Sequence, residues 1–254
     1  MSTPILTVKD LSMRFGGLLA VDQVEFEVGT DEVFAIIGPN GAGKTTVFNC
    51  VGGFYRPTTG DILMDGQSIT GQPSHKVARH GLVRTFQNVR LFKSLTVLEN
   101  LLVAQHTQMQ TGLVRGLFKA PSFRKSESEA KRRAAEWLDF MDIRQYANRE
   151  AGTLAYGHQR RLEIARCMIT KPRLLMLDEP AAGLNPQEKR DLQALIDQLR
   201  REFGVAVLLI EHDMSLVMGV SDRILVMEHG KPITTGLPEE VRTDPRVIKA
   251  YLGE

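Results

Sequence analysis

A short glycine-rich run is the strongest chemical signal in this sequence. It consists of Gly38, Pro39, Asn40, Gly41, Ala42, Gly43, Lys44 and Thr45, and a second threonine, Thr46, follows. The spacing is that of a phosphate-binding loop, in which backbone N–H groups and a helix N-terminus surround a phosphate. In such a loop Lys44 reaches the β- and γ-phosphates, and the Thr45 hydroxyl serves as a ligand for Mg²⁺. The alternative is a glycine-rich turn between a strand and a helix, with no ligand.

Two adjacent carboxylates form the second signal. Asp178 and Glu179 follow the apolar run 174–177. A buried strand that ends in this way brings its carboxylates to the edge of the sheet where open α/β sheets bind ligands. Asp178 could hold Mg²⁺ through water, and Glu179 could accept a proton from an attacking water. Capping of a helix is the alternative use of such residues.

The segments around these motifs alternate between apolar strands and helices. Strands are predicted at 5–8, 24–28, 32–37, 61–64, 173–177, 205–210 and 224–227. Helices are predicted at 44–52, 160–169, 186–201 and 214–220. This alternation indicates an α/β fold with a mainly parallel sheet covered on both faces.

The middle of the chain, between about residues 87 and 148, has a different composition and a helical periodicity. It contains the basic segment 112–133, with seven basic and two acidic residues. Leu113, Val114, Leu117 and Phe118 lie among the first of these charges, so the segment could be a membrane-surface or partner-docking patch. A solvated connector leading into a helix at 127–140 is the alternative.

Composition and charge exclude several classes of protein. The chain has 254 residues, of which 43% are hydrophobic and 24% charged, so it is long enough for a sizeable core. Its net charge of +2 is too balanced for a strongly nucleic-acid-binding surface. No apolar run approaches the length of a membrane-spanning helix, and we expect a cytosolic chain whose membrane role is peripheral. Cys50 and Cys167 are expected to be small buried residues in a reducing compartment.

Taken in order, the motifs resemble those of the ATP-hydrolysing subunits of ABC transporters, over nearly the whole chain. The resemblance implies roles for three further residues. Phe15 matches the aromatic residue that stacks on adenine, and Gln87 matches the glutamine that senses Mg²⁺ and the membrane partner. His212 matches the histidine that contacts the γ-phosphate. With Lys44 and Glu179, Gln87 and His212 would form the catalytic set, and Thr45, Gln87 and Asp178 the metal ligands.

Residues 154–158 resemble the signature of this family, which contacts the ATP bound by the opposite subunit. The residues involved are Ala155, Tyr156, Gly157 and His158. Ala155 replaces a serine whose hydroxyl would bond the γ-phosphate, Tyr156 replaces a glycine, and His158 replaces a glutamine. Asn185 lies in the segment that crosses the dimer interface, where aspartate is usual.

The resemblance also implies the architecture and the partners. A single ATP-binding domain is expected, with a phosphate-loop core and an N-terminal antiparallel β-subdomain in residues 1–86 and 172–254. A helical subdomain would occupy about 87–171. Residues 84–92, 95–101, 160–166 and 245–253 resemble the branch that takes up branched-chain amino acids.

An importer of this branch would use ATP and Mg²⁺ at the cytoplasmic face of a bacterial inner membrane. Its other parts would be two permease subunits, a second ATPase subunit (identical or different) and, indirectly, a periplasmic binding protein. No nucleic acid is expected. The alternatives are an ABC ATPase for another cargo, such as exported lipopolysaccharide, a soluble ABC protein of DNA repair or translation, and a small-molecule kinase.

Overall fold

The computed structural model describes residues 4–87, 89–106 and 121–252. The chain forms two compact units, residues 1–87 with 173–254 and residues 88–172. These boundaries lie one residue from those expected for the core and the helical subdomain. We call them unit 1 and unit 2.

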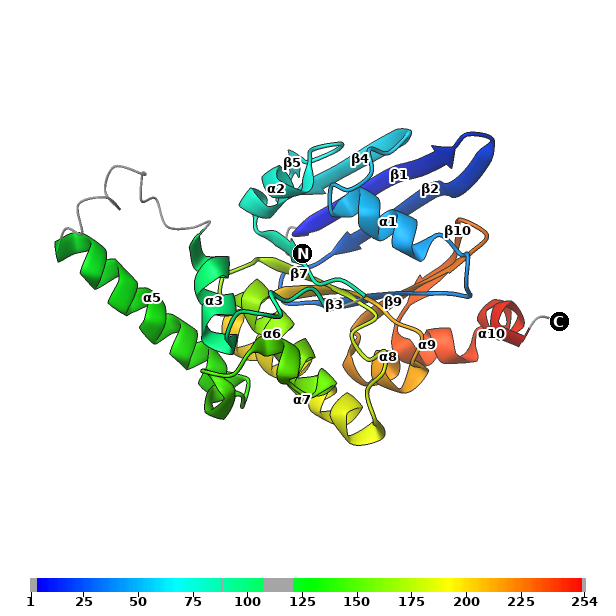
Figure 1. Ribbon diagram of the computed structural model, residues 1–254. Coiled ribbons are helices and arrows are strands. Elements are labelled where there is room, and N and C mark those ends of the chain that lie inside the picture. The colour runs from blue at the N-terminus through cyan, green and yellow to red at the C-terminus, as the bar shows by residue number, and fades with distance from the viewer. Residues whose placement is uncertain (1–3, 88, 107–120, 253–254) are drawn as a thin grey trace. The chain divides into compact units, whose positions relative to one another are not determined.

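Unit 1 contains a four-stranded antiparallel sheet in the order β2-β1-β4-β5 (Figure 1). Its strands are β1 (Leu6–Phe15), β2 (Leu18–Val28), β4 (Thr59–Met64) and β5 (Gln67–Ser68). The expected N-terminal β-subdomain is therefore present. β1 is longer than the predicted strand at 5–8. Its pairing register with β2 shifts after Val8 and again after Leu11, so the sequence pattern reveals only the first part of the strand. Such irregularities interrupt the alternation of apolar and polar residues by which a strand is recognised.

The second sheet of unit 1 has six strands, in the order β10-β9-β3-β8-β7-β6. They are β3 (Val33–Ile37), β6 (Leu82–Arg84), β7 (Leu174–Asp178), β8 (Ala206–Ile210), β9 (Arg223–Glu228) and β10 (Lys231–Gly236). All pairs are parallel except that of β10 with β9. Every residue of β3, β7 and β8 is buried, which explains the continuous apolar runs in the sequence. The predicted α/β class is confirmed.

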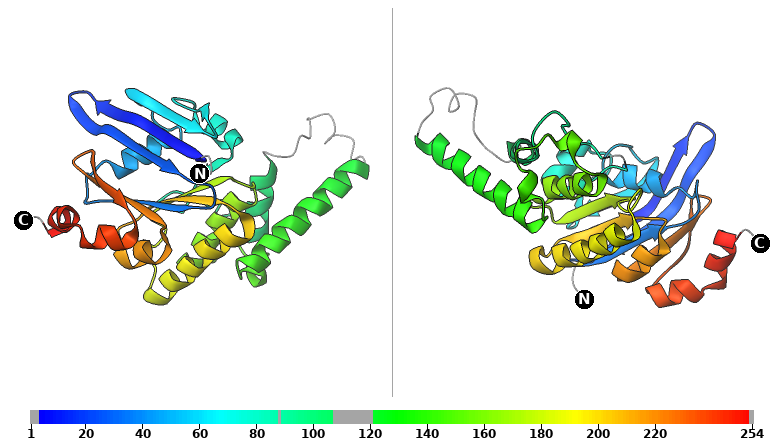
Figure 2. Two further views of the ribbon diagram at one scale, coloured as in Figure 1. Left: turned by 180° about the vertical axis from the view of Figure 1, so that it is seen from behind. Right: turned by 60° about the horizontal axis from the view of Figure 1, so that its bottom comes forward.

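Helices lie on both sides of this sheet. On one side, Val47, Phe48 and Val51 of α1 (Lys44–Val51) join Phe34 and residues of both sheets in one core cluster. On the other side lie α7 (Pro186–Phe203), α8 (Met214–Val220) and α9 (Pro238–Thr243), as the views in Figure 2 show. The short helix α2 (Ser74–Val77) and the C-terminal helix α10 (Pro245–Leu252) complete unit 1, with a single 3₁₀ turn at Ala78–His80.

Unit 2 is helical in its described part. It contains α3 (Val97–His106), α5 (Pro121–Phe140), α6 (Tyr156–Met168) and 3₁₀ turns at Arg144–Tyr146 and Ala151–Thr153. Residues 107–120, and with them the apolar positions of the basic segment, lie outside the described residues. Further along α5, Lys131 pairs with Glu127 and Arg132 with Glu136, one helical turn away in each case. This described part of the basic segment is thus a helix with exposed ion pairs.

The junction between β3 and the glycine-rich loop depends on the absence of a side chain at Gly38. Gly38 has φ +149°, and a Cβ there would lie 2.1 Å from the Met227 carbonyl oxygen of β9. Gly41 also has a positive φ, +80°, but a Cβ at that position would meet no atom within 4 Å. A substitution at Gly41 would therefore strain the backbone only, whereas one at Gly38 would also produce a steric clash.

We predict that Gly38→Ala destabilises unit 1 more than Gly41→Ala does. Both substitutions place a Cβ on a backbone with a positive φ, which costs about 1–3 kcal/mol. Gly38→Ala also forces the β9 carbonyl to move, which adds about 1–3 kcal/mol of overpacking. Urea unfolding of the two variants measures the difference. Equal free energies of unfolding would contradict the steric argument.

Candidate active site

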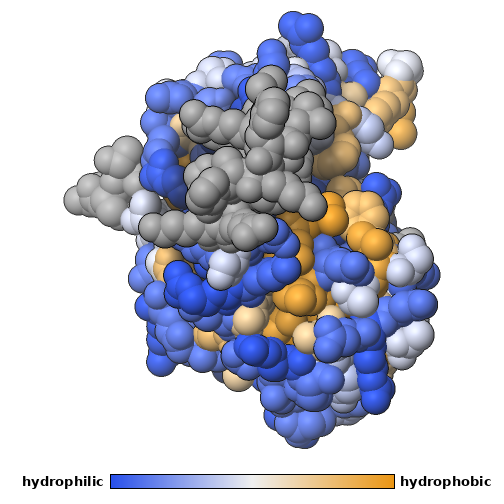
Figure 3. Space-filling model, turned by 60° about the vertical axis from the view of Figure 1, so that its left-hand side comes forward, coloured by the Kyte–Doolittle hydropathy of each residue, from blue (hydrophilic) through white to orange (hydrophobic). Residues whose placement is uncertain are grey.

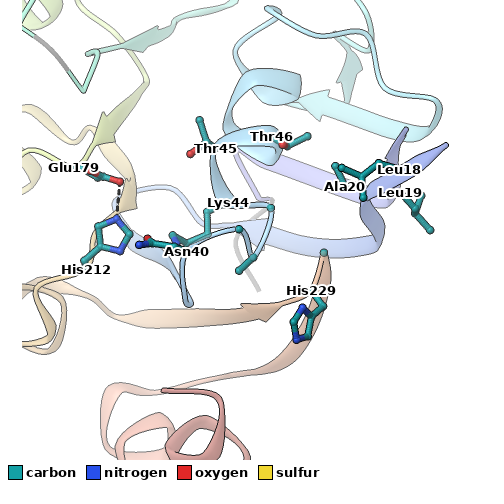
Figure 4. A pocket seen from close by; sticks show the side chains of 14 residues that line it. Leu18, Leu19, Ala20, Asn40, Lys44, Thr45, Thr46, Glu179, His212 and His229 are labelled. Carbon is teal, nitrogen blue, oxygen red and sulfur yellow. Dashed lines mark hydrogen bonds and ion pairs between the residues drawn. The ribbon is translucent and has the colours of Figure 1, made fainter. Parts of the chain in front are cut away.

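A pocket of about 400 Å³ lies over the glycine-rich loop. In Figure 4 Lys44, Thr45 and Thr46 occupy its middle, with Glu179 and His212 to one side and Leu18–Ala20 to the other. The loop residues Asn40–Gly43 line it too, with His229 and Gly230. Because β3, β7 and β8 are parallel, the loops that follow them meet at one edge of the sheet. The pocket lies at that edge.

The loop holds its lysine through its own carbonyl groups. Lys44 begins α1 directly after Gly43, whose φ of 95° is left-handed, and its side chain is buried. Its Nζ donates hydrogen bonds to the carbonyl oxygens of Gly38, at 2.7 Å, and Pro39, at 3.0 Å. Burial lowers the pKa of Lys44, and the negative charge of Glu179 opposes that effect. A desolvated cation is therefore available at the start of the helix, where a phosphate would bind.

Glu179 is held from two sides by two of the other predicted catalytic residues. His212 Nε2 lies 2.6 Å from Glu179 Oε1, as the dashed line in Figure 4 marks, and Gln87 Nε2 donates to Oε2 at 2.7 Å. The backbone of Glu179 is left-handed, with φ +47°, and its N–H donates to the carbonyl of Ile210. A non-glycine residue in this region is strained, and such strain is concentrated at functional sites. The sequence-predicted trio of Gln87, Glu179 and His212 is thus brought together.

A buried carboxylate next to His212, that of Glu211, connects the two loops that carry Glu179 and His212. Glu211 Oε1 accepts a hydrogen bond from the N–H of Ala181, at 2.6 Å. Its Oε2 accepts from the N–H groups of His212, at 2.9 Å, and Asp213, at 3.3 Å. Glu211 therefore joins the loop after β7 to the loop after β8. Sequence reasoning missed this role, for which the only signal was an acidic residue at the end of an apolar strand.

Asp178, the last residue of β7, is buried and is not among the residues that line the pocket. Its Oδ2 is 2.6 Å from Arg84 Nη2. The predicted metal ligands Thr45, Gln87 and Asp178 all supply oxygen atoms, which is the donor type that Mg²⁺ prefers. Mg²⁺ is usually held by one or two carboxylates together with phosphate oxygens, and one buried aspartate beside a phosphate loop fits that pattern.

Phe15 does not line the pocket. It ends β1, is 43% exposed, and packs edge-to-face against Tyr55, with 5.3 Å between the ring centroids. Its role as an adenine platform stays a prediction. Leu18–Ala20, His229 and Gly230 do line the pocket and were not predicted, because they carry no motif and reach the loop only through the fold.

Asn185 acts as the N-cap of α7. Its side-chain oxygen accepts from the N–H groups of Gln187 and Glu188, and the Glu188 carboxylate accepts from the N–H of Asn185. Asparagine and aspartate cap helices about equally well. The departure from the family pattern at this position therefore preserves the local structure.

The signature residues lie in unit 2, at the start of α6. Ala155 is the N-cap residue and makes no side-chain capping bond, so the first N–H groups of the helix lack that partner. The Tyr156 hydroxyl accepts from Arg160, and the His158 ring lies 4.8 Å from the ring of Tyr146. Of the four residues, Tyr156 and His158 thus pack within unit 2, and the N-terminus of α6 is suited to an anion.

The segment after Gln87 forms hydrogen bonds with α6 within unit 2. The N–H of Arg90 donates to Glu163 at 3.1 Å, and Arg166 donates to the carbonyl of Arg90. Arg166 also lies over the ring of Phe92, 5.0 Å from its centroid. Phe92 is 47% exposed, so an apolar ring stands at the surface beside the signature helix.

Both cysteines are free and buried, as predicted. Burial raises the pKa of Cys50 in α1 to about 11 and that of Cys167 in α6 to about 12. Neither thiol is suited to nucleophilic chemistry at neutral pH.

Comparison with known proteins shows the family of the chain. Residues 21–182 match the family described as ABC transporter, and residues 231–254 match the one described as branched-chain amino acid ATP-binding cassette transporter. The chain is 63% identical to BraF of Pseudomonas aeruginosa and 60% identical to LivG of Escherichia coli K12. Both are high-affinity branched-chain amino acid transport ATP-binding proteins, and each match covers 100% of both chains.

Solved structures lead to the same family. The ATP-binding cassette MJ1267 in its ADP conformation has a TM-score of 0.86 and 32% identity, with 100% of both chains covered. A nucleotide-free cassette of an ABC transporter has a TM-score of 0.85 and 31% identity, covering 99% of this chain and 100% of the other. These matches confirm the predicted fold class and family. The chain therefore belongs to the ABC transporter ATPases, as one of their ATP-binding proteins.

Proposed function

We propose that this protein is the ATP-hydrolysing subunit of an importer for branched-chain amino acids. The observation that carries the proposal is the convergence of Gln87 and His212 on Glu179 beside a phosphate loop. Full-length identity of 60–63% to BraF and LivG, together with the match at residues 231–254, supports the cargo class. Units 1 and 2 would act as a single ATP-binding domain.

During hydrolysis, different residues of the chain would bind the phosphates, accept the proton and hold Mg²⁺. The backbone N–H groups of residues 40–45 and the Lys44 ammonium would hold the phosphates, which requires Lys44 to exchange its loop carbonyls for phosphate oxygens. Glu179 would accept the proton of the attacking water, and Gln87 and His212 would fix the direction of its carboxylate. Thr45, Asp178 and Gln87 would hold Mg²⁺, which neutralises charge on the β- and γ-phosphates when bound.

The proposed partners are two permease subunits and a second ATPase subunit at the cytoplasmic face of a bacterial inner membrane. Among the described residues, no helix is long and apolar enough to cross a bilayer. Figure 3 shows a mainly hydrophilic face with an apolar area at its centre. Apolar surface of this kind suits docking to a protein partner.

We expect Glu179→Gln to retain nucleotide binding and to lose hydrolysis by about 10²- to 10⁴-fold. Glutamine keeps the shape of the side chain but cannot take the proton. Phosphate release and binding of a fluorescent ATP analogue measure the two properties. Glu202→Gln, on the exposed side of α7, is the matched control and should hydrolyse ATP at the wild-type rate. Wild-type turnover by Glu179→Gln would refute the role of this residue.

We expect Ala155→Ser to strengthen ATP-driven dimerisation in the Glu179→Gln background. The serine hydroxyl could bond the γ-phosphate held by the opposite subunit, which is worth up to about 1.5–3 kcal/mol. ATP titrations of the single and double variants, each with the partner ATPase, followed by sizing chromatography, measure the gain.

A serine at this position would also cap α6. Ala155→Gly is the control, because glycine is a fair N-cap and brings no hydroxyl. Equal gains from serine and glycine would mean that capping explains the effect and that no phosphate contact was missing.

A further inference from the structure

Arg84 is the last residue of β6 and points its guanidinium into unit 1. Its side chain is only 8% exposed. Nη2 lies 2.6 Å from Asp178 Oδ2, and Nη1 donates to Asn49 Oδ1 at 2.7 Å. One side chain thus joins the last residue of β7 to α1.

Three aromatic rings enclose the guanidinium. Its central carbon lies 5.4, 5.3 and 5.8 Å from the ring centroids of Phe48, Phe54 and Phe86. Cation–π contacts of this kind favour arginine, because its planar group can face a ring and still donate hydrogen bonds at its edge. The cage therefore fixes the orientation in which Arg84 meets its two partners.

The elements that Arg84 connects are those that carry the expected metal ligands. Asn49 lies four residues after Thr45 in α1, so the two side chains lie one turn apart on the same face of the helix. Asp178 is itself an expected ligand. Gln87 follows Arg84 by three residues in the chain. A change in the position of the guanidinium would therefore alter the spacing between Thr45 and Asp178.

We propose that Arg84, together with Asn49, is a positioning residue for the magnesium site, which sets the distance between α1 and the end of β7. The proposal rests on the proposed ATPase function. Arg84 touches neither nucleotide nor metal in this scheme. It would act by holding the Asp178 carboxylate in a position in which it could serve as a ligand for Mg²⁺.

Charge and geometry can be separated by substitution. Arg84→Lys keeps the positive charge beside Asp178, but a single ammonium cannot reproduce the fork that spans both partners. Asn49→Leu leaves the ion pair in place and removes only the anchor on α1. Arg200→Lys is the matched control, since Arg200 forms an ion pair with Asp222 at 2.7 Å. Asp222 accepts from the N–H of Val33, at the end of β3 opposite to the glycine-rich loop.

The experiment measures the affinity of the full chain for fluorescent ADP, with Mg²⁺ and with EDTA. ADP is used so that neither hydrolysis nor ATP-driven dimerisation contributes. Residues that support a metal ligand typically alter metal affinity by about 10- to 100-fold. We expect Arg84→Lys to reduce the gain in affinity that Mg²⁺ provides by about tenfold or more, with the affinity in EDTA within about twofold of wild type. Asn49→Leu should also reduce the gain in affinity that Mg²⁺ provides, and Arg200→Lys should leave that gain unchanged.

If Mg²⁺ raises the affinity for ADP as much in Arg84→Lys and Asn49→Leu as in the wild type, the proposal is overturned, even if the melting temperatures of the variants fall. Such a result would make Arg84 a structural ion pair only. If Arg84→Lys does not fold, Asn49→Leu decides the question, because the backbone carbonyl of Asn49 still accepts from Phe54 and Tyr55. Failure of the wild-type chain to bind ADP would overturn the proposed function itself, and the two failures are therefore distinguishable.

Discussion

Two carboxylates in succession at the end of a buried strand are the constraint around which unit 1 is organised. A buried charge is costly unless a partner compensates for it. Asp178 obtains its compensation from Arg84, and Glu179 obtains it from His212, Gln87 and the field of Lys44. The partners come from three segments, namely the start of α1, residues 84–87 and the loop after β8. The same pairing that offsets the cost of burying the carboxylates also brings the catalytic groups together.

Much of this arrangement follows from local sequence. The glycine-rich loop lies between a fully buried strand and a helix, and the predicted strands at 32–37, 173–177 and 205–210 correspond to β3, β7 and β8 within one residue at each end. These elements are identifiable because both faces of a parallel strand are covered, so that apolar residues run without interruption. The helix at 214–220 agrees with α8, which the Asp213 side chain caps.

Other parts depend on contacts that no local pattern contains. β6 has only three residues and ends in the charged Arg84, whose burial requires Asp178 from a segment more than ninety residues away. β10 includes Pro232 and lies at the edge of the sheet, where proline is tolerated but weakens the strand pattern. The pocket residues Leu18–Ala20 begin β2, and His229 lies in the turn between β9 and β10; neither segment carries a recognisable motif. Their importance comes from the approach of distant backbones, which sequence reasoning does not reveal.

The departures from the family's common motifs have distinct physical consequences. Asn185 keeps the cap of α7, so the loop before that helix retains its support. Ala155 leaves the start of α6 without a side-chain cap, whereas His158 gains a ring contact with Tyr146. Departures from a family motif therefore differ in their effect. Asn185 still caps its helix, whereas Ala155 lacks the polar group that a serine would supply.

The two buried thiols have a practical consequence for spectroscopy. With a pKa of about 11 for Cys50 and about 12 for Cys167, the fraction of thiolate at neutral pH is about one in ten thousand or less. Maleimide dyes and spin labels react with thiolates, so the natural side chains form a silent background. A cysteine introduced at the surface would be labelled selectively in the otherwise unmodified chain. Distances between labels on two copies could then follow their approach and separation during each cycle of nucleotide turnover.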